Sequence, residues 1–178
     1  MREAELAMER RLGAPEEDVL PVQTNLANTY QMIGRNEEAL CMKQDVYAGR
    51  LKLNGKEHAE TLLAANNYAN SLLHLKRFGE AKSLMRKAIP VARRVLGESH
   101  ETTLRMRTNY GRALCKDDCA TLDDLRQAVT SLEDTERTAL RVLGGAHPMT
   151  GWIGERLQNA RDALSARKTP SPPPPGSA

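Results

Sequence analysis

The sequence predicts an all-α protein, a right-handed superhelical solenoid of antiparallel helix pairs. Three observations predict it: glycines recur at a fixed spacing, asparagines and alanines keep the same spacing, and apolar residues follow a helical pattern. Aromatic residues make up only 3% of the chain, and Val and Ile do not gather in alternating runs, so strands find little support. A stacked array of helices is therefore expected.

Glycine marks the repeat most clearly. Gly13, Gly55 and Gly97 are 42 residues apart, and Gly144 follows 47 residues later. The longer last interval predicts a five-residue insertion in the third unit, in the stretch CKDDCATLDD at 115–124. Two further sets keep this register: Asn25, Asn67 and Asn109, and Ala39, Ala81 and Ala128.

Each repeat is expected to hold two helices. A large, a small and a large residue share one stripe of each first helix, as Tyr68, Ala69 and Leu72 do, and the small residue allows a close partner helix. Ala69 and Ala81 are expected at such close contacts, and a glycine ends each second helix. First helices are predicted at 18–33, 59–75, 101–116 and 148–167, and second helices at 36–52, 78–96 and 122–143.

The same periodicity divides the chain into units. Its start is expected to be the end of a truncated repeat of a longer array, and its last helix a polar terminal cap. The proline-rich tail, with Pro172 to Pro175, is expected to be extended and disordered, either a plain linker or a ligand for proline-binding modules. The predicted units are 1–13 (truncated repeat), 14–55, 56–97 and 98–144 (three repeats), 145–168 (cap) and 169–178 (tail).

Four strings carry a family resemblance: RVLGESHETTL, RVLGGAHPMTG, NLANTY and NYANSLL. They resemble the linker and first helix of the roughly 42-residue tetratricopeptide repeat found in kinesin light chains and in many signalling proteins. The resemblance extends over residues 1 to 165, although APEED replaces the His-containing linker after Gly13. It implies a protein-binding solenoid in which the first helices line a concave groove that holds an extended peptide.

The resemblance places one stripe of each first helix in that groove. Amides can pair with the backbone of a peptide, and arginines can bind its carboxylates. Replacing Asn67 and Asn109 by Ala is expected to weaken binding and leave melting nearly unchanged, since both amides are expected to be exposed. Alternatively, the amides bond neighbouring helices and the charges form a solvated face. The candidate groove residues are Asn25, Asn28, Asn67, Asn70, His74, Arg105, Asn109, Arg112 and Lys116.

Catalysis, cofactors and metals are not expected. The sequence has no phosphate-binding glycine loop, no nucleophile elbow and no histidines one helical turn apart. His58, His100 and His147 occur once per repeat, too far apart to share a metal, so they are expected to cap or pack the linkers. The three cysteines, Cys41, Cys115 and Cys119, are expected to be reduced.

The expected partner is a protein or peptide, and the basic end of the stripe favours an acidic one. A net charge of +3 is too small to indicate nucleic acid, and neither a membrane span nor a secretory signal is present, which predicts a cytoplasmic protein. Two other functions stay open: a structural spacer that self-associates end to end, and a regulatory domain of a missing effector.

Overall fold

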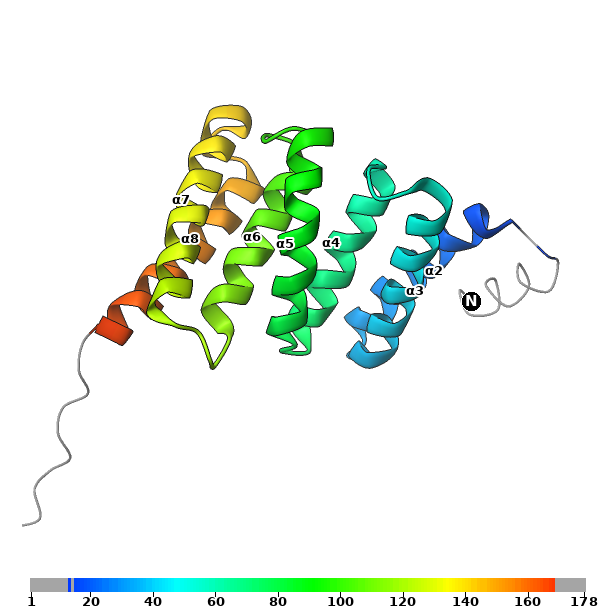
Figure 1. The fold of residues 1–178 in the computed structure, drawn as a ribbon, viewed down its shortest axis with the longest axis horizontal. Helices are drawn as coiled ribbons and strands as arrows, with labels where there is room; N and C mark the ends of the chain where they lie inside the picture. The colour runs from blue at the N-terminus through cyan, green and yellow to red at the C-terminus, as the bar shows by residue number, and fades with distance from the viewer. Residues whose placement is uncertain (1–12, 14, 169–178) are drawn as a thin grey trace, which may run out of the picture.

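The computed structural model describes residue 13 and residues 15–168. All regular secondary structure in this part is α-helical, and no predicted helix end differs from the observed one by more than two residues (Figure 1). The predicted helix pairs are therefore confirmed, whereas the predicted truncated repeat at residues 1–12 and the predicted tail at residues 169–178 lie outside the described residues. The helices are α2 (Glu16–Met32), α3 (Asn36–Asn54), α4 (Ala59–His74), α5 (Phe78–Val95), α6 (Glu101–Lys116), α7 (Leu122–Leu143) and α8 (Pro148–Lys168).

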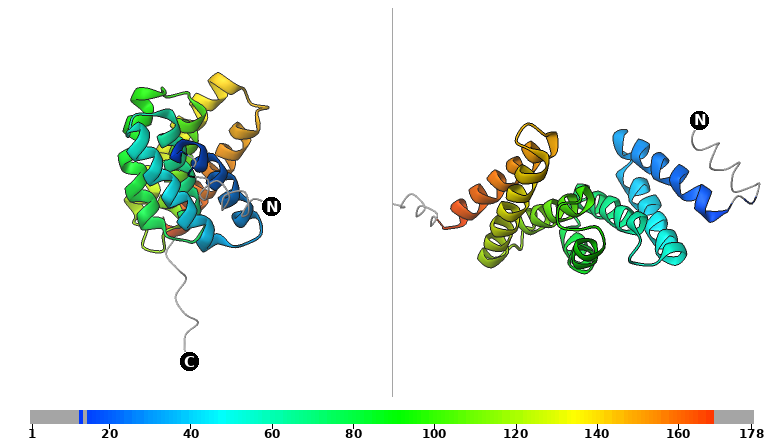
Figure 2. Two further views of the ribbon diagram at one scale, coloured as in Figure 1. Left: turned by 90° about the vertical axis from the view of Figure 1, so that its right-hand side faces the viewer. Right: turned by 90° about the horizontal axis from the view of Figure 1, so that it is seen from above.

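The helices form two layers of a curved stack. In Figure 1, α3, α5 and α7 lie in front, with α4, α6 and α8 behind them. Seen from above in Figure 2, the stack bends so that α2, α4, α6 and α8 line its concave side. On that side α4 packs against α6 and α6 against α8, whereas α5 and α7 have no comparable contact on the convex side. The predicted solenoid, with first helices on the concave face, is thus confirmed.

A histidine begins each first helix after the first repeat. The Nδ1 atoms of His58, His100 and His147 accept the backbone N–H of the second residue after each, at 3.3, 3.1 and 3.2 Å. The expected capping role is confirmed. The threonine three residues after each histidine donates a hydrogen bond to a backbone carbonyl that precedes the turn. For example, Thr61 Oγ1 donates to the carbonyl of Arg50 in α3 at 3.1 Å.

Small residues lie where the helices approach most closely. Ala69 and Ala81 are fully buried, as expected. In the third repeat Gly111 takes the place of Ala69, and a Cβ on it would be 2.7 Å from Cγ of Leu132. Since Leu132 is itself fully buried, glycine is the residue that lets α6 and α7 come this close.

The α6–α7 turn, where the insertion is predicted, is longer than its counterparts. Five residues, 117–121, separate these helices, against three in each of the two earlier pairs, and α7 has 22 residues where α3 has 19 and α5 has 18. Thr121 and Asp124 form a reciprocal capping box at the start of α7. Lys82 Nζ bonds Asp117 Oδ2 at 2.5 Å and so ties the longer turn to α5.

The three cysteines have free thiols, and burial raises the pKa of Cys115 to about 11. This thiol is therefore a poor nucleophile at neutral pH. Across residues 15–168, no helix has the length and apolar character required to cross a bilayer. The same residues contain no cluster of three or more His, Cys, Asp or Glu side chains suited to a metal ion.

Candidate functional site

The concave face presents most of the predicted groove residues to solvent. Asn25, Asn28, His74, Arg105 and Lys116 are exposed, and Asn67, Asn70 and Arg112 are half-buried. They come from three helices, α2, α4 and α6, which all lie on the concave side of the stack (Figure 2). The structure therefore arranges eight of the nine candidates along one accessible surface.

Shallow hollows lie between neighbouring first helices. One of about 210 Å³ between α2 and α4 is lined by the candidate groove residues Asn25 and Asn67 and, among others, by Pro21 and Leu63. Another of about 300 Å³ between α6 and α8 is lined by Arg105 and by Trp152 and its neighbours. Both are open depressions along the groove, which suits an extended chain better than an enclosed small molecule.

Asn109 is the exception, and its expected exposure is wrong. Only 4% of its surface is exposed, and its Nδ2 donates to Oδ1 of Asn66, on α4, at 3.0 Å. The reason is that α6 is packed between α4 and α8, so the side of the stripe nearer α4 is covered. For this residue the alternative holds, because its amide bonds a neighbouring helix within the stack.

The basic residues of the stripe differ in whether their charge is already matched. Arg105 is paired with Glu101 through its Nη2, at 2.7 Å. Arg112 has no carboxylate within 4.0 Å in the part of the chain that the structure describes. Burial lowers the pKa of Arg112, and the positive charge of Arg156 on α8 lowers it further. Arg112 is therefore a half-buried guanidinium beside a second one.

The same positive environment acts on His74. Burial lowers the pKa of His74, and Arg112 and Lys43 lower it further through their charges. A lowered histidine pKa means that the imidazole is neutral at pH 7 and able to accept or donate one hydrogen bond. His74, Arg112 and Arg156 thus make a patch across α4, α6 and α8, which we call the concave basic patch.

Arg156 is a residue that the sequence reasoning missed. Its Nε is buried and has no hydrogen-bond partner among the described residues, while its Nη1 is 3.6 Å from Oε1 of the adjacent Glu155. A signal was available, because Arg156 follows Asn109 by the same 47 residues that separate Gly97 from Gly144. Extending the predicted groove positions by 47 residues into α8 identifies both Arg156 and Trp152.

The concave basic patch is suited to holding an anion. Partly desolvated arginines form stronger, charge-assisted hydrogen bonds to carboxylates than exposed ones do. The amides of Asn67 and Asn70 lie on the same face. The arrangement offers backbone-pairing groups next to a site for negative charge.

Two family models match the chain, and both describe a tetratricopeptide repeat. One matches residues 22–60 and the other residues 60–120. Together they span more than half of the 178 residues. The matched region holds α3, α4, α5 and α6 complete, with most of α2, so it contains all nine candidate groove residues and the whole α4–α6 contact of the concave face.

Curated relatives and solved structures are similar over most of the chain. Clustered mitochondria protein homologs of Aspergillus fumigatus and Emericella nidulans are each 24% identical over 163 residues, which is 89% of this chain but only 12% and 13% of theirs. A putative kinesin light chain from Podosopora anserina with nearly identical TPR-like repeats superposes with a TM-score of 0.75 at 23% identity, covering 94% of this chain and 77% of that one. A second crystal structure of that protein, of a variant with a single substitution, gives 0.77 at 22% identity, with the same shares covered.

Proposed function

Because the chain belongs to the tetratricopeptide repeat proteins, we propose that it is a non-catalytic scaffold whose concave face binds an extended acidic segment of a partner protein. One observation carries the acidic preference. Arg112 and Arg156 lie near each other on adjacent first helices, half-buried, and Arg112 has no carboxylate within 4.0 Å among residues 15–168. A carboxylate from a partner relieves the repulsion between the two guanidinium groups and accepts their hydrogen bonds.

The amides supply the second part of the recognition. Asn67 and Asn70 lie one helical turn apart on α4, and each can donate to a peptide carbonyl and accept from a peptide N–H. Such pairing needs an extended backbone, because a helical ligand has already bonded its own N–H and C=O groups. The hollow beside Asn67 and Leu63 gives room for one side chain of the ligand.

Binding of a simple acidic peptide tests this proposal. The probe is a fluorescein-labelled peptide of about ten residues with alternating glutamate and alanine, and its neutral control has glutamine in place of glutamate. We expect fluorescence anisotropy to detect binding of the acidic peptide alone. Arg112→Gln should weaken that binding about tenfold, or about 1.4 kcal/mol, because a charge-assisted bond is lost.

A matched variant separates recognition from general attraction. Arg126→Gln makes the same charge change on an exposed side chain of α7 that pairs with Asp123 and does not line the concave face. It should leave the affinity within about twofold of the wild type in 0.15 M salt, where distant exposed charges are screened. Equal losses in both variants, or no loss in either, would show that the concave basic patch does not recognise the peptide.

End-to-end self-association and a cytoplasmic location stay predictions from the sequence. The matched relatives are about eight times longer than the segment they share with this chain. The proposal is therefore confined to the repeat array itself.

A further inference from the structure

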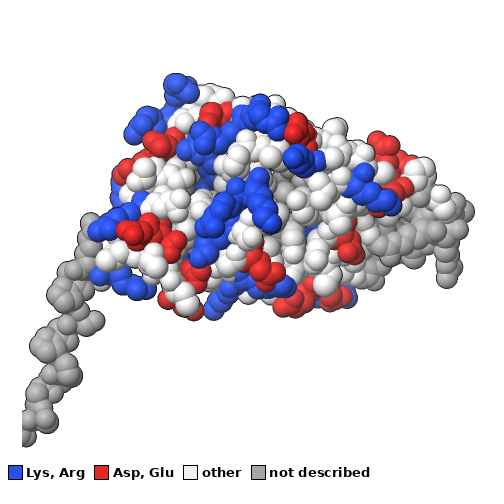
Figure 3. Space-filling view, viewed as in Figure 1, with Lys and Arg blue, Asp and Glu red and all other residues white. Residues whose placement is uncertain are grey.

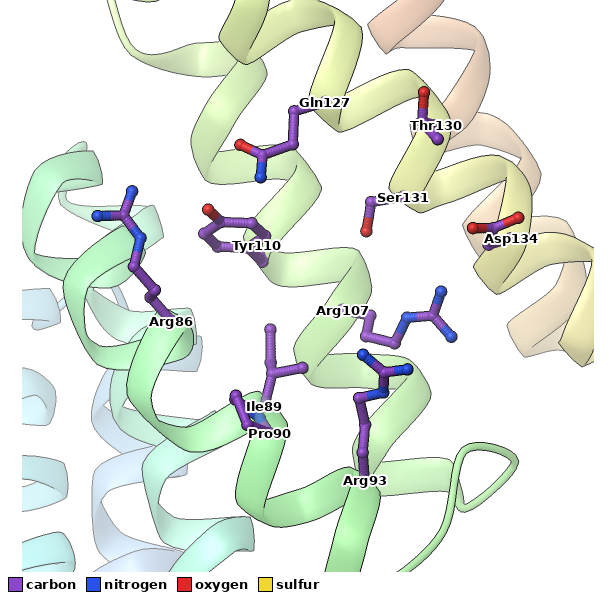
Figure 4. A pocket seen from close by; sticks show the side chains of 10 residues that line it. All are labelled: Arg86, Ile89, Pro90, Arg93, Arg107, Tyr110, Gln127, Thr130, Ser131 and Asp134. Atoms are coloured by element: carbon purple, nitrogen blue, oxygen red, sulfur yellow. The ribbon is translucent and has the colours of Figure 1, made fainter.

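The convex side of the molecule carries a basic cleft in addition to the concave basic patch. Its residues are not among the groove residues predicted from the sequence. Figure 3 shows that Lys and Arg side chains gather over the middle of this face. Here α5 and α7 stand apart, and a cleft of about 620 Å³ opens between them with α6 as its floor. Figure 4 shows the side chains of all three helices that line it.

The cleft has two positive ends. Arg86 lies at one end and has no carboxylate within 4.0 Å in the described ranges. Arg93 and Arg107 lie at the other end with their guanidinium groups side by side (Figure 4). Because Arg86 and Arg93 are seven residues apart on one helix, the two ends are separated by about 10 Å.

An apolar floor joins these ends. Ile89 and the ring of Tyr110 lie between Arg86 and Arg93, with the Tyr110 hydroxyl directed toward Gln127 (Figure 4). Pro90 has no N–H, so the carbonyl of Arg86 lacks the donor that a helix normally supplies. The cleft therefore offers an apolar contact and a backbone acceptor between two sites for negative charge.

The paired end is only partly neutralised. One carboxylate, that of Glu98, bonds Arg93 and is also 3.4 Å from Arg107. Burial lowers the pKa of Arg107 and the charge of Arg93 adds to that effect, while Glu98 and Asp134 oppose it. Asp134 is itself paired with Arg137 at 3.2 Å. Two arginines thus share one acidic partner.

We propose that this convex cleft between α5 and α7 is a second binding site, for an acidic peptide segment with two carboxylates about 10 Å apart and an apolar side chain between them. In an extended chain, which advances about 3.1 to 3.4 Å per residue, that distance separates side chains three residues apart. One carboxylate binds Arg86 and the other binds Arg93 and Arg107. The apolar side chain rests on Ile89 and Tyr110. A single small anion cannot reach both ends.

The test uses a fluorescein-labelled peptide containing Gly-Asp-Leu-Ala-Asp-Gly and a control with both aspartates replaced by asparagine. Binding is measured by anisotropy to four proteins: wild type, a concave variant (Arg112→Gln with Asn67→Ala), a convex variant (Arg86→Gln with Arg93→Gln), and the combination. We expect the concave variant to keep binding and the combination to lose at least about tenfold relative to it, which is about 1.4 kcal/mol.

A matched control lies on the same helix. Lys87→Gln with Arg94→Gln removes two exposed positive charges from α5, one residue along from each tested arginine and outside the cleft lining. Added to the concave variant, it should change the affinity by less than about twofold. Circular dichroism confirms that each variant keeps its helices.

Two further results bear on the inference. Glu98→Gln should strengthen binding several-fold, because it removes the carboxylate that competes for Arg93 and Arg107. The inference is overturned if the combination binds as well as the concave variant, if the matched control loses as much, or if the asparagine peptide binds equally. A loss confined to the concave variant would support the proposed concave function and exclude this second site.

Discussion

The first helix pair, α2–α3, and the third, α6–α7, occupy equivalent places in the repeat but have different interiors. Leu132 of α7 is fully buried in the main core, and Met85 fills the same place in α5. In α3 that place is taken by Lys43, which is 3% exposed. Its Nζ donates to Oε1 of Gln31, at the position of the buried Leu73 in the second repeat. One repeat position thus holds either a core residue or a buried ammonium.

This difference indicates that stability is uneven along the array. A buried amine bonded only to a neutral amide is costly, because its hydration is lost without a compensating negative charge. The cluster formed by Val19, Leu26, Tyr30 and Ala39 is also separate from the main core, which extends from α4 to α8. In a repeat array each unit is held chiefly by its neighbours, so α2–α3 should open before the rest.

The largest expected effect compares the two interiors directly. Leu132→Ala should lower the free energy of unfolding by about 3 kcal/mol, since it leaves a cavity in a fully buried site. Lys43→Ala at the equivalent place should lower it by less than about 1 kcal/mol, because removing the buried charge offsets the lost packing. Urea unfolding followed by circular dichroism measures both. Equal losses would mean that the two interiors contribute alike.

The second prediction concerns pH. Burial lowers the pKa of Lys43 from 10.5 to about 8. Between these values the unfolded chain binds more protons than the folded one, so the contribution of Lys43 to the free energy of unfolding rises with pH. Its unfavourable effect is complete below about pH 8 and has vanished above 10.5. Lys43→Met should therefore stabilise the protein at pH 7 by roughly 2 kcal/mol.

The difference between the Met variant and the wild type provides the readout, because other groups titrate equally in both. That difference should shrink as pH rises from 8 to about 10.5. Thermal unfolding at pH 7, 8, 9 and 10 follows it. A constant difference would show that Lys43 is not the titrating group, and a destabilised variant would show that its bond to Gln31 outweighs its burial.

The smallest expected effect concerns the asparagines that recur at one place in the repeat. Asn109→Ala in α6 leaves Oδ1 of the buried Asn66 without its donor and should cost about 1 to 2 kcal/mol. Asn67→Ala in α4, at the equivalent but more exposed position, should stay within about 0.5 kcal/mol of the wild type. Melting temperatures distinguish them. A loss for Asn67→Ala as large as that for Asn109→Ala would place both amides in the stack.

Helix bounds were predictable from the sequence because local chemistry sets them. Gly55 and Gly144 end α3 and α7 with φ of 78° and 83°, and the histidine caps begin the first helices at the expected residues. The sequence could not predict which side of a helix its neighbours cover. Asn25 and Asn109 have the same place in the repeat, yet only Asn109 belongs to a helix that has a first helix on both sides.

The convex cleft escaped prediction for a related reason. Its lining comes from α5, α6 and α7. The cleft exists because α5 and α7 do not pack against each other, and the sequence periodicity does not predict the distance between them. The sequence did show the charge, since Arg86, Arg93 and Arg107 fall in a basic stretch. Only the fold shows that these three residues meet in one cleft and that Arg112 faces the other side.

The distance between α5 and α7 depends on the angle between neighbouring repeats, and this angle affects both the convex cleft and the concave face. Along the inner curve α6 packs against both α4 and α8, so these contacts act as the pivot, and a ligand bound between α5 and α7 would hold that angle fixed. The same angle sets how far apart α4, α6 and α8 present their groove residues. If one ligand changes the affinity for the other through this angle, the reverse effect must have the same size, because coupling free energies are reciprocal.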